Sequence, residues 1–391
     1  MPLSKRKSIS TKSEFEWSQL HASHSMADSL LKRLELVTRR AFLRMLERRD
    51  HATPSVPWTE ARLLSELGPT PTILFLRQDR LGDVIMSTPI MIAIRDRFPA
   101  AKMILLLGKN NTGAIPLLPF PMEIAVYRKS ILKDWSTIRR LRKQKIDLVI
   151  DLTDKASVTS SLLVGFVRGK IALGIEKQND TVYDITVPRL DQESVHVARR
   201  IAELLRPLGI DPDRIDLRPR IGMTTESRIP GRVGFNITAR VEERCAPTEP
   251  SAVIARTITE LRGVGEVIIL FDPREVERAK EIVRLASSPQ VHLARTTTSF
   301  LDFARLISTC EYLITTDTSV VQIAAALDIP MLVLANPTPG EHFWTPQGVL
   351  FELWEQRPAL RELEPQPAIR LFTNLVRRHT TAMDAKPQFP S

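Results

Sequence analysis

The chain has 391 residues, a length typical of two or three domains, and 43% of them are hydrophobic, which excludes an intrinsically disordered protein. No apolar run reaches the roughly 18 residues that span a bilayer, and two distant cysteines, Cys245 and Cys310, match no metal-site or redox spacing. The formal charge of +10 favours an anionic partner: nucleic acid, a phospholipid surface or a phosphorylated substrate. The N-terminus has no secretory pattern, so we expect a cytoplasmic protein.

Residues 1–71 form a basic extension ahead of the first strong strand. The first fifty residues carry 11 basic and 6 acidic side chains, half of the excess positive charge, and the other half is spread over the remaining chain. Residues 1–28 are polar and aperiodic, which is typical of disorder. From Leu30 to Met45 apolar residues recur at helical spacing with Lys and Arg between them. This basic amphipathic helix fits two interpretations equally: a helix lying on an anionic membrane, or a helix packed on the domain with a solvated basic face.

From residue 72 onward, strand-like and helix-like segments alternate. In residues 72–205 the pattern predicts strands at 73–77, 103–107, 124–127, 148–151 and 171–174, and helices at 84–97, 135–145, 156–167 and 194–205. Residues 206–232 hold four prolines and many charges, which indicates an interdomain linker. Residues 233–350 predict strands at 233–235, 267–271, 291–293, 312–315 and 331–335, and helices at 251–262, 274–287, 300–308 and 320–327. In the tail, residues 351–391, a helix-like stretch at 368–378 could pack back on the first domain.

This alternation predicts an α/β fold class. Strands that alternate with helices form parallel βαβ units in an open sheet that is covered on both faces. Two such domains joined by a linker create a cleft onto which the carboxyl ends of both sheets open, and ligands of open α/β sheets bind at that edge. We therefore expect functional residues directly after strands.

The first group of candidate residues, 77–84, follows a strand and opens a helix. Gly82 permits a tight turn and close approach of a ligand to the backbone. Asp83 has an ordinary interpretation as a helix cap, worth about 1 kcal/mol, and a functional one as a carboxylate that accepts a proton from a hydroxyl nucleophile. Arg77 and Arg80 beside it could hold an anionic acceptor.

Two further groups follow strands of the second domain. At 315–319 a strand ends in small hydroxyl residues before an apolar helix begins. Free N–H groups and hydroxyls at a helix N-terminus suit a phosphate or pyrophosphate, although the same residues also make an ordinary cap. At 271–280 a strand runs into a helix, where Glu275 either compensates the helix dipole or hydrogen-bonds a ribose.

Several catalytic signatures are absent from the sequence. No P-loop, no G-x-G-x-x-G after a strand, no H-E-x-x-H and no G-x-S-x-G occurs, and the seven histidines are dispersed. We therefore expect neither a metal site nor a cofactor. Aromatic residues make up only 6% and no nucleic-acid-binding module is present, so we do not expect nucleic acid as a partner.

The order and distances of these groups resemble glycosyltransferase family 9, the ADP-heptose:lipopolysaccharide heptosyltransferases. The N-terminal match is ILFLRQDRLGDV at 73–84, which continues to Pro99. The C-terminal match is LITTDT at 313–318, followed by AAAL at 324–327 and NPTP at 336–339. The similarity covers roughly residues 72–348, and having both blocks in place makes it fairly specific.

The resemblance implies a GT-B fold, in which two Rossmann-like domains with parallel sheets face each other across a cleft. It implies that the first domain binds the acceptor and the second the nucleotide-sugar, with inverting transfer and no essential metal. Asp83 matches the general base, and Arg77 and Arg80 are the expected acceptor contacts. The expected donor-binding residues, with Glu275 on the ribose, are Thr238, Arg240, Arg244, Glu275, Thr298, Asp317, Thr318, Ser319 and Gln322.

The sequence departs from the family pattern around the donor. Ser319 and Gln322 stand where the family usually has Gly and His, which adds a Cβ at the phosphate loop and removes a possible cationic donor to the pyrophosphate. The family's Lys after the first strand of the second domain is missing from 236–244, where Arg240 or Arg244 could replace its charge.

We therefore predict an inverting glycosyltransferase that moves a heptose or related sugar from ADP-heptose to the inner core of lipopolysaccharide. The expected partners are the nucleotide-sugar, a lipid A–core glycolipid and an anionic membrane surface, at the inner face of the inner membrane. Two alternatives stay open: a related transferase that uses another sugar nucleotide, and a catalytically degenerate binding protein.

Overall fold

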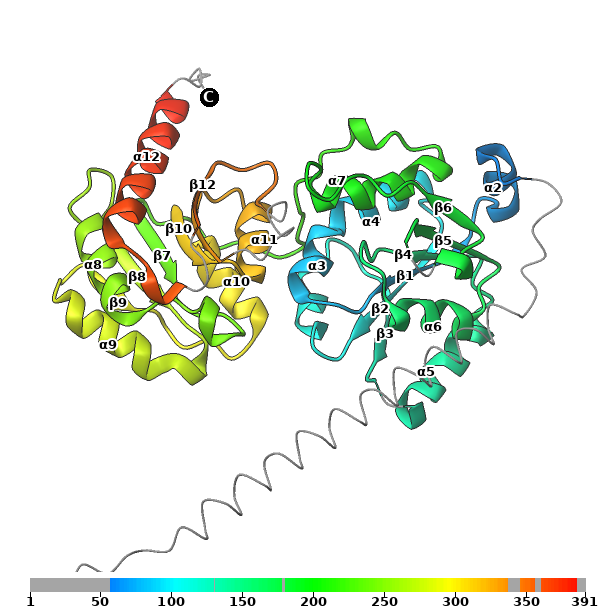
Figure 1. The fold of residues 1–391 in the computed structure, drawn as a ribbon, viewed down its shortest axis with the longest axis horizontal. Coiled ribbons are helices and arrows are strands. Elements are labelled where there is room, and N and C mark those ends of the chain that lie inside the picture. The colour runs from blue at the N-terminus through cyan, green and yellow to red at the C-terminus, as the bar shows by residue number, and fades with distance from the viewer. Residues whose placement is uncertain (1–56, 130, 178–179, 337–344, 356–359, 385–391) are drawn as a thin grey trace, which may run out of the picture.

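The computed structural model describes residues 57–129, 131–177, 180–336, 345–355 and 360–384. The basic helix expected between Leu30 and Met45 lies outside these residues, as does most of the NPTP motif. Two α/β domains lie side by side and are joined by the segment after α7 (Figure 1). Every helix in the described part of the chain is too short or too polar to cross a bilayer.

The first domain is a six-stranded sheet of parallel strands in the order β3-β2-β1-β4-β5-β6 (Figure 1). Its strands are β1 (Thr72–Arg77), β2 (Lys102–Gly108), β3 (Glu123–Tyr127), β4 (Leu148–Asp151), β5 (Ile171–Ile175) and β6 (Ile185–Val187). Its helices are α2 (Glu60–Leu67), α3 (Leu81–Met86), α4 (Thr88–Arg97), α5 (Ile131–Lys143), α6 (Val158–Val167) and α7 (Val197–Ala202). The strand order reverses between β1 and β4, and ligands of such sheets bind at that switch point.

The second domain repeats this architecture in the order β12-β11-β10-β7-β8-β9, again with parallel strands. Its strands are β7 (Arg232–Asn236), β8 (Glu266–Leu270), β9 (Val291–Leu293), β10 (Tyr312–Thr316), β11 (Met331–Ala335) and β12 (Phe351–Glu355). Its helices are α8 (Thr248–Ile258), α9 (Val276–Ala286), α10 (Phe300–Ser308), α11 (Ser319–Ala326) and α12 (Pro365–Asp384). Its switch point lies between β7 and β10. The prediction of an α/β fold with two parallel sheets is confirmed.

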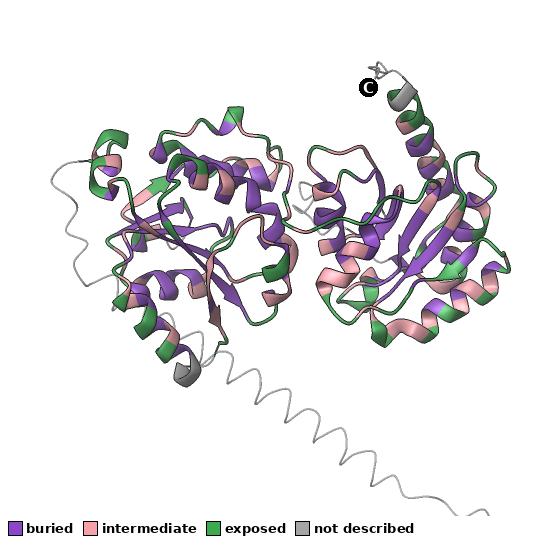
Figure 2. Ribbon diagram, turned by 180° about the vertical axis from the view of Figure 1, so that it is seen from behind, coloured by how far each residue is buried: buried purple, intermediate pink, exposed green. Residues whose placement is uncertain are grey.

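Both sheets are buried on their two faces. The inner strands β1 and β11 are almost wholly buried and are continuous apolar runs, as expected for parallel strands covered by helices on both sides. Figure 2 shows the buried residues concentrated in the strands and in the inward sides of the helices. Each fully buried Leu, Ile or Phe contributes about 1.5–3 kcal/mol, so these strands hold their carboxyl ends rigidly.

The helix expected at 84–97 is in fact two helices. It begins earlier, at Leu81, and breaks at Ser87. The reason is Pro89, whose ring lacks an N–H and would clash with the carbonyl group of Ile85 in a continuous helix. The hydroxyl of Thr88 donates to that Ile85 oxygen at 2.6 Å instead. The break leaves α3 as a short separate helix at the domain boundary.

The tail packs on the second domain, so the suggestion that its helix returns to the first domain is wrong. Helix α12 contacts α8, β11 and β12, and β12 itself extends the second sheet beyond residue 350. Phe372 and Leu375 of α12 are fully buried, and Phe372 meets Tyr312 edge-on at 6.0 Å. Apolar side chains on the inward face of α12 therefore complete the second core.

The two domains touch through α3 and α11. Ile85 of α3 and Leu117 both belong to the first domain and are each 1% exposed. Both pack in the hydrophobic cluster of the second domain. Figure 1 shows α3 on the side of the first domain that faces α10 and α11. This apolar contact brings the carboxyl edges of the two sheets together.

Candidate active site

The carboxyl ends of both sheets open onto one cavity of about 980 Å³ between the domains. The first domain contributes residues that follow β1, β2 and β4, and the second contributes residues that follow β7, β8, β9 and β10. Eleven of the predicted site residues line it: Arg77, Arg80, Asp83, Thr238, Arg240, Arg244, Thr298, Asp317, Thr318, Ser319 and Gln322. The structure therefore brings both groups of predicted residues to one place.

Asp83 lies in the first turn of α3 and is 5% exposed. Its Oδ2 accepts the backbone N–H of Arg80 at 3.0 Å, and its Oδ1 lies 3.9 Å from Nη2 of Arg77. One oxygen therefore caps the helix, which is the ordinary interpretation of this residue. The other oxygen stays available at the cavity wall to accept a proton from a bound hydroxyl.

Arg77 is a buried structural centre of the first domain's site, with 1% exposure. Its Nε donates to the carbonyl oxygen of Asp83 at 3.0 Å and its Nη1 to that of Leu152 at 2.6 Å. Its Nη1 also lies 3.4 Å from Oδ2 of Asp79. Nη2 has no hydrogen-bond partner in the described part of the chain. Arg77 thus joins the end of β1 to α3 and to the end of β4.

Asp79 is a second carboxylate in the cavity, which we did not predict. Burial raises the pKa of its carboxyl group, Arg77 lowers it, and the negative charges of Asp83 and Asp151 raise it further, with a net rise. The signal was present in the sequence, since Asp79 follows β1 directly, but nothing local distinguishes it from a loop residue.

The end of β4 supplies a segment that we also did not predict: Thr153, Asp154 and Lys155 line the cavity. Asp154 forms a buried ion pair with Arg200 of α7 at 2.7 Å, whereas Lys155 is exposed. The polar run at a strand end was the available signal. Lys155 adds a cation on the first domain's side of the cavity.

A buried polar cluster contacts the segment that follows β4 and fixes its position. Lys177 and Asp151 are fully buried and 2.9 Å apart, and the Lys177 ammonium also donates to the carbonyl oxygen of Thr153 at 2.8 Å. Tyr183 donates to the same Asp151 carboxylate at 2.5 Å, and burial and that negative charge raise the pKa of its phenol. Because buried charges are stable only when paired, the cluster fixes the β4 loop.

The second domain's side of the cavity is built around the start of α11. The hydroxyl of Thr318 accepts the backbone N–H of Val320 at 3.4 Å and caps the helix. Arg244 lies 3.5 Å from the Asp317 carboxylate, which places a guanidinium beside this turn. The hydroxyl of Thr238 accepts the backbone N–H of Asp272 at 3.2 Å and ties the ends of β7 and β8 together.

Glu275 is the predicted donor residue that does not line the cavity. Its carboxylate pairs with Arg278 at 3.2 Å in the first turns of the following helix. The neighbouring residues Asp272 and Arg274, which form an ion pair at 2.9 Å, line the cavity instead. Aromatic walls come from Phe271, Phe300 and Phe303.

The domains come close together at Gly82 and Ser319, and Ser319 is one of the positions that depart from the family pattern. A Cβ added at Gly82 would lie 3.3 Å from the Cα and 3.5 Å from the Cβ of Ser319. Position 319 carries a side chain where the family usually has glycine, and the residue that faces it on α3 is itself a glycine, Gly82. The contact between α3 and α11 therefore leaves little room for a large side chain at position 82.

We expect Gly82→Leu to hold the domains apart, because a Leu side chain has no room while α3 and α11 are in contact. Displacement of about 1 Å between reacting groups costs about 10²-fold in rate, so kcat/KM should fall by at least that factor. Gly82→Ala, which requires a shift of only a few tenths of an ångström, is the matched control with a small loss. Wild-type kcat/KM in the Leu variant would contradict the closed arrangement.

His196 forms a second link between the domains, at the start of α7. Its Nδ1 accepts the backbone N–H of Ala198 at 3.1 Å, so Nε2 carries the proton and donates to the carbonyl oxygen of Thr345 at 3.0 Å. Burial lowers the pKa of the imidazole from 6.5 to about 4, against the opposing bond to Thr345 and together with the charge of Arg200.

This pKa predicts a loss of stability in acid. The unfolded chain takes up a proton at His196 near pH 6.5 and the folded chain only near pH 4, so the free energy of unfolding should fall as the pH drops between these values. His196→Gln keeps an Nε2 donor and does not titrate, so its unfolding free energy should depend less on pH over that window. Urea unfolding of both proteins at the two ends of the window measures this, and equal dependence would refute the assignment.

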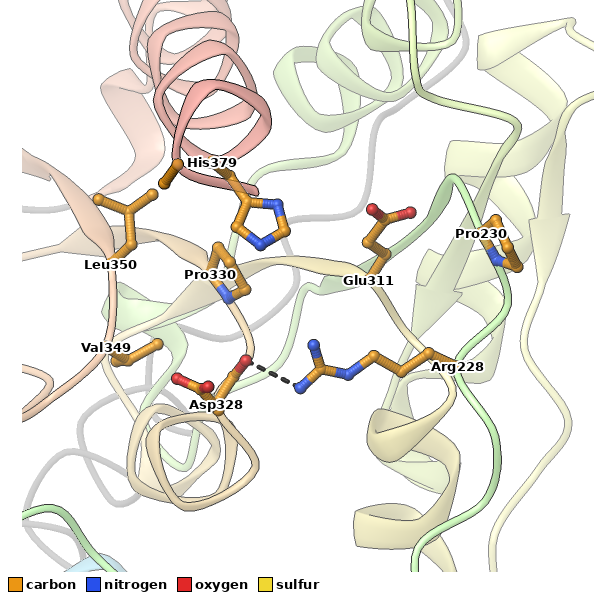
Figure 3. A pocket seen from close by; sticks show the side chains of 9 residues that line it. Arg228, Pro230, Glu311, Asp328, Pro330, Val349, Leu350 and His379 are labelled. Atoms are coloured by element: carbon orange, nitrogen blue, oxygen red, sulfur yellow. Dashed lines mark hydrogen bonds between the residues drawn. The ribbon is translucent and has the colours of Figure 1, made fainter. Parts of the chain in front are cut away.

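A second cavity, of about 510 Å³, lies at the opposite edge of the second sheet (Figure 3). The Arg228 guanidinium at its mouth donates to the carbonyl oxygens of Leu327 and Asp328 at 2.5 and 2.8 Å, and Glu311 accepts the backbone N–H of Gly231 at 2.6 Å. No predicted site residue lines it. Within the described residues no group of three His, Cys, Asp or Glu side chains could hold a metal ion.

Comparison with known proteins identifies the family. The model of glycosyltransferase family 9 (heptosyltransferase) matches residues 135–359, more than half of the chain. Lipopolysaccharide heptosyltransferase 3 of Escherichia coli is 26% identical over 306 residues, which are 70% of this chain and 86% of that protein. The protein of the same name from Escherichia coli strain K12 is 26% identical over 312 residues, 72% of this chain and 89% of its own.

Solved structures show the same fold. A family 9 glycosyltransferase from Veillonella parvula DSM 2008 matches with a TM-score of 0.65 at 18% identity, covering 80% of this chain and 99% of that one. Escherichia coli heptosyltransferase WaaC, solved with ADP, matches with a TM-score of 0.62 at 17% identity and the same coverage. The family expected from the two sequence blocks is confirmed: the chain belongs to glycosyltransferase family 9 and is a glycosyltransferase with the GT-B fold.

Proposed function

We propose that this enzyme transfers a heptose from ADP-heptose to the inner core of lipopolysaccharide, on an acceptor that is a phosphorylated, Kdo-bearing lipid A precursor. The observation that carries the proposal is the single cavity in which Asp83 of the first domain faces the start of α11 in the second. The relatives named heptosyltransferase 3 act on lipopolysaccharide, and WaaC has been solved with ADP and with ADP-2-deoxy-2-fluoro heptose.

The proposed reaction is one in-line displacement at the anomeric carbon. Asp83 takes the proton of the acceptor hydroxyl as its oxygen forms the new bond to that carbon. The bond from the carbon to the diphosphate oxygen breaks, and ADP leaves with the electron pair, which inverts the configuration. The acceptor proton stays on the Asp83 carboxylate until solvent removes it.

The leaving diphosphate gains negative charge, and the second domain holds the groups that stabilise it. The N-terminus of α11 offers the positive end of its helix dipole and the hydroxyl of Thr318, and Arg244 offers a guanidinium. We propose that these groups replace a metal ion and that Arg240, which also lines the cavity, adds a second cation. On this proposal transfer continues in the presence of a chelator.

The acceptor side suits a phosphorylated substrate at a membrane. Arg80 and the exposed Lys155 line the cavity on the first domain, opposite the donor groups. We propose that the protein works at the cytoplasmic face of the inner membrane, where such an acceptor presents its sugars. The net charge of +10 and the basic segment within residues 1–50 support attraction to that anionic surface.

Ser319 favours a second candidate, a family 9 transferase with a different sugar nucleotide. Its Cβ lies at the turn that would meet the diphosphate, where the family usually has none, and it narrows the donor side. A degenerate binding protein would show the same change but would not turn over.

Thermal shifts with ADP, UDP and GDP and their sugars distinguish these candidates. A ligand present at 100 times its Kd stabilises the folded state by about 2.7 kcal/mol, which raises Tm by several degrees. We expect a shift with ADP and ADP-heptose and none with the other two bases. A shift with UDP or GDP alone would favour the second candidate, and no shift with any nucleotide would contradict both.

A further inference from the structure

The positive charge outside the N-terminal segment is concentrated in one place, contrary to our expectation that it is spread evenly. Residues 128–145 contain eight Lys or Arg and one Asp, a formal charge of +7 against +10 for the whole chain. These residues form the loop after β3, helix α5 and the turn that follows it. A charge of this density on one helix is a feature that requires a partner or a solvated face.

Helix α5 has a buried face and an exposed basic face. Asp134, Ile138 and Leu141 are buried and pack toward the sheet. Arg139 and Lys143 are exposed on the opposite face, four and eight residues after Trp135. Trp135 is 54% exposed, the highest value for a large hydrophobic side chain in the described residues. Figure 2 shows exposed residues along the outward side of α5.

The cations of this face are not neutralised by the protein. In the part of the chain that the structure describes, Arg128, Lys129, Arg139 and Lys143 form no ion pair. Asp134, the only acid of the segment, is buried and accepts the backbone N–H of Arg128 at 2.7 Å. The nearest acid outside the segment, Glu123, pairs with Lys102 at 2.9 Å and lies 3.8 Å from Arg140.

This basic face begins at the same edge of the first sheet as the acceptor side of the cavity. The loop that carries Arg128 and Lys129 follows the carboxyl end of β3, just as Lys109 follows β2 and Lys155 follows β4. All four side chains are exposed. Because parallel strands end at one edge, these cations and the first turn of α5 lie on the side of the domain where the acceptor enters.

We propose that the face of α5 formed by Trp135, Arg139 and Lys143, together with Arg128 and Lys129, docks on an anionic phospholipid bilayer. Tryptophan is favoured at the level of the lipid headgroups, and each Lys or Arg near an anionic surface strengthens binding. A bilayer fits better than a protein groove because the face is cationic and has a single large exposed aromatic side chain. The inference rests on the proposed function only in that the acceptor is a membrane glycolipid.

The test is co-sedimentation of the full chain with vesicles of phosphatidylcholine, with and without phosphatidylglycerol, and with no nucleotide or acceptor. One variant carries Arg128→Gln, Lys129→Gln, Arg139→Gln and Lys143→Gln. The matched control removes the same charge from exposed cations of the second domain through Arg256→Gln, Arg262→Gln, Arg370→Gln and Arg377→Gln. Trp135→Ser tests the aromatic separately.

The α5 variant should bind phosphatidylglycerol vesicles at least about 10-fold more weakly than the wild type, and the control should bind within about twofold. Trp135→Ser should weaken binding without changing its dependence on salt. Wild-type binding by the α5 variant, which would mean that residues 1–50 alone hold the bilayer, overturns the proposal, as does an equal loss in the control.

A second measurement separates docking from catalysis. None of the four residues altered in this variant lines the cavity. Its transfer to a water-soluble acceptor without acyl chains should therefore be unchanged. If the wild type binds vesicles but transfers no sugar, the proposed function is contradicted and the proposal of membrane docking is not.

Discussion

Asp83→Asn should fold like the wild type and lose most of its transfer activity. General-base catalysis contributes about 10²–10⁴-fold, and an amide cannot take the proton of the acceptor hydroxyl, so kcat should fall by that factor. The carbonyl oxygen of Asn can still accept the backbone N–H of Arg80, the bond that caps α3. Tm should therefore change by no more than a few degrees, and the thermal shift with ADP should be retained.

Asp79→Asn is the matched control, because Asp79 lines the same cavity and touches the same arginine. If Asp83 is the base, the Asp79 variant should keep kcat within about 10-fold of the wild type, a loss smaller than a general base supplies. Wild-type-like turnover by Asp83→Asn would refute the base assignment, and a larger loss in Asp79→Asn would transfer the role to that residue.

Arg77→Met should be the most destabilising single change in the first domain's site. It removes the donor to the carbonyl oxygens of Asp83 and Leu152 and leaves the Asp79 carboxylate without its cation. Hydrogen bonds that involve a charged group contribute about 1.5–3 kcal/mol each, so the loss of these two buried bonds should lower the free energy of unfolding measured in urea by at least about 3 kcal/mol.

The comparison for Arg77→Met is Arg262→Met in the second domain, an exposed arginine with no ion pair among the described residues. Surface changes of this kind stay within about 0.5 kcal/mol. If Arg77→Met were as stable as Arg262→Met, Arg77 would not be the residue that joins β1, α3 and the end of β4, and its contact with an acceptor would become the better explanation of its position.

Local sequence patterns were sufficient to predict the strands of both sheets and the two groups of residues that line the cavity. Apolar runs such as 73–77 and 331–335 are strands because a parallel strand buried on both faces needs no alternation. The residues at 77–84 and 315–319 meet because each group directly follows a strand next to a switch point. The sequence could place each group on its domain, and the shared cavity followed from the domain arrangement.

The features that were missed depend on contacts between distant segments. Arg77 is buried because Leu152, 75 positions later, accepts its hydrogen bond. Burial raises the pKa of Asp79 and Asp151 of β4 adds to the rise, and α12 packs on the second domain because β12 extends that sheet. None of these contacts has a local signature.

A transfer assay with the purified full chain, ADP-heptose, a Kdo-bearing lipid A acceptor and a chelator tests the proposed reaction most directly. Mass spectrometry of the acceptor and measurement of released ADP follow the two products together. We predict that the acceptor gains the mass of one heptose for each ADP released, and that Asp83→Asn and Arg244→Ala both abolish most of this gain. An acceptor of unchanged mass, with ADP and acceptor each shown to bind, would contradict it.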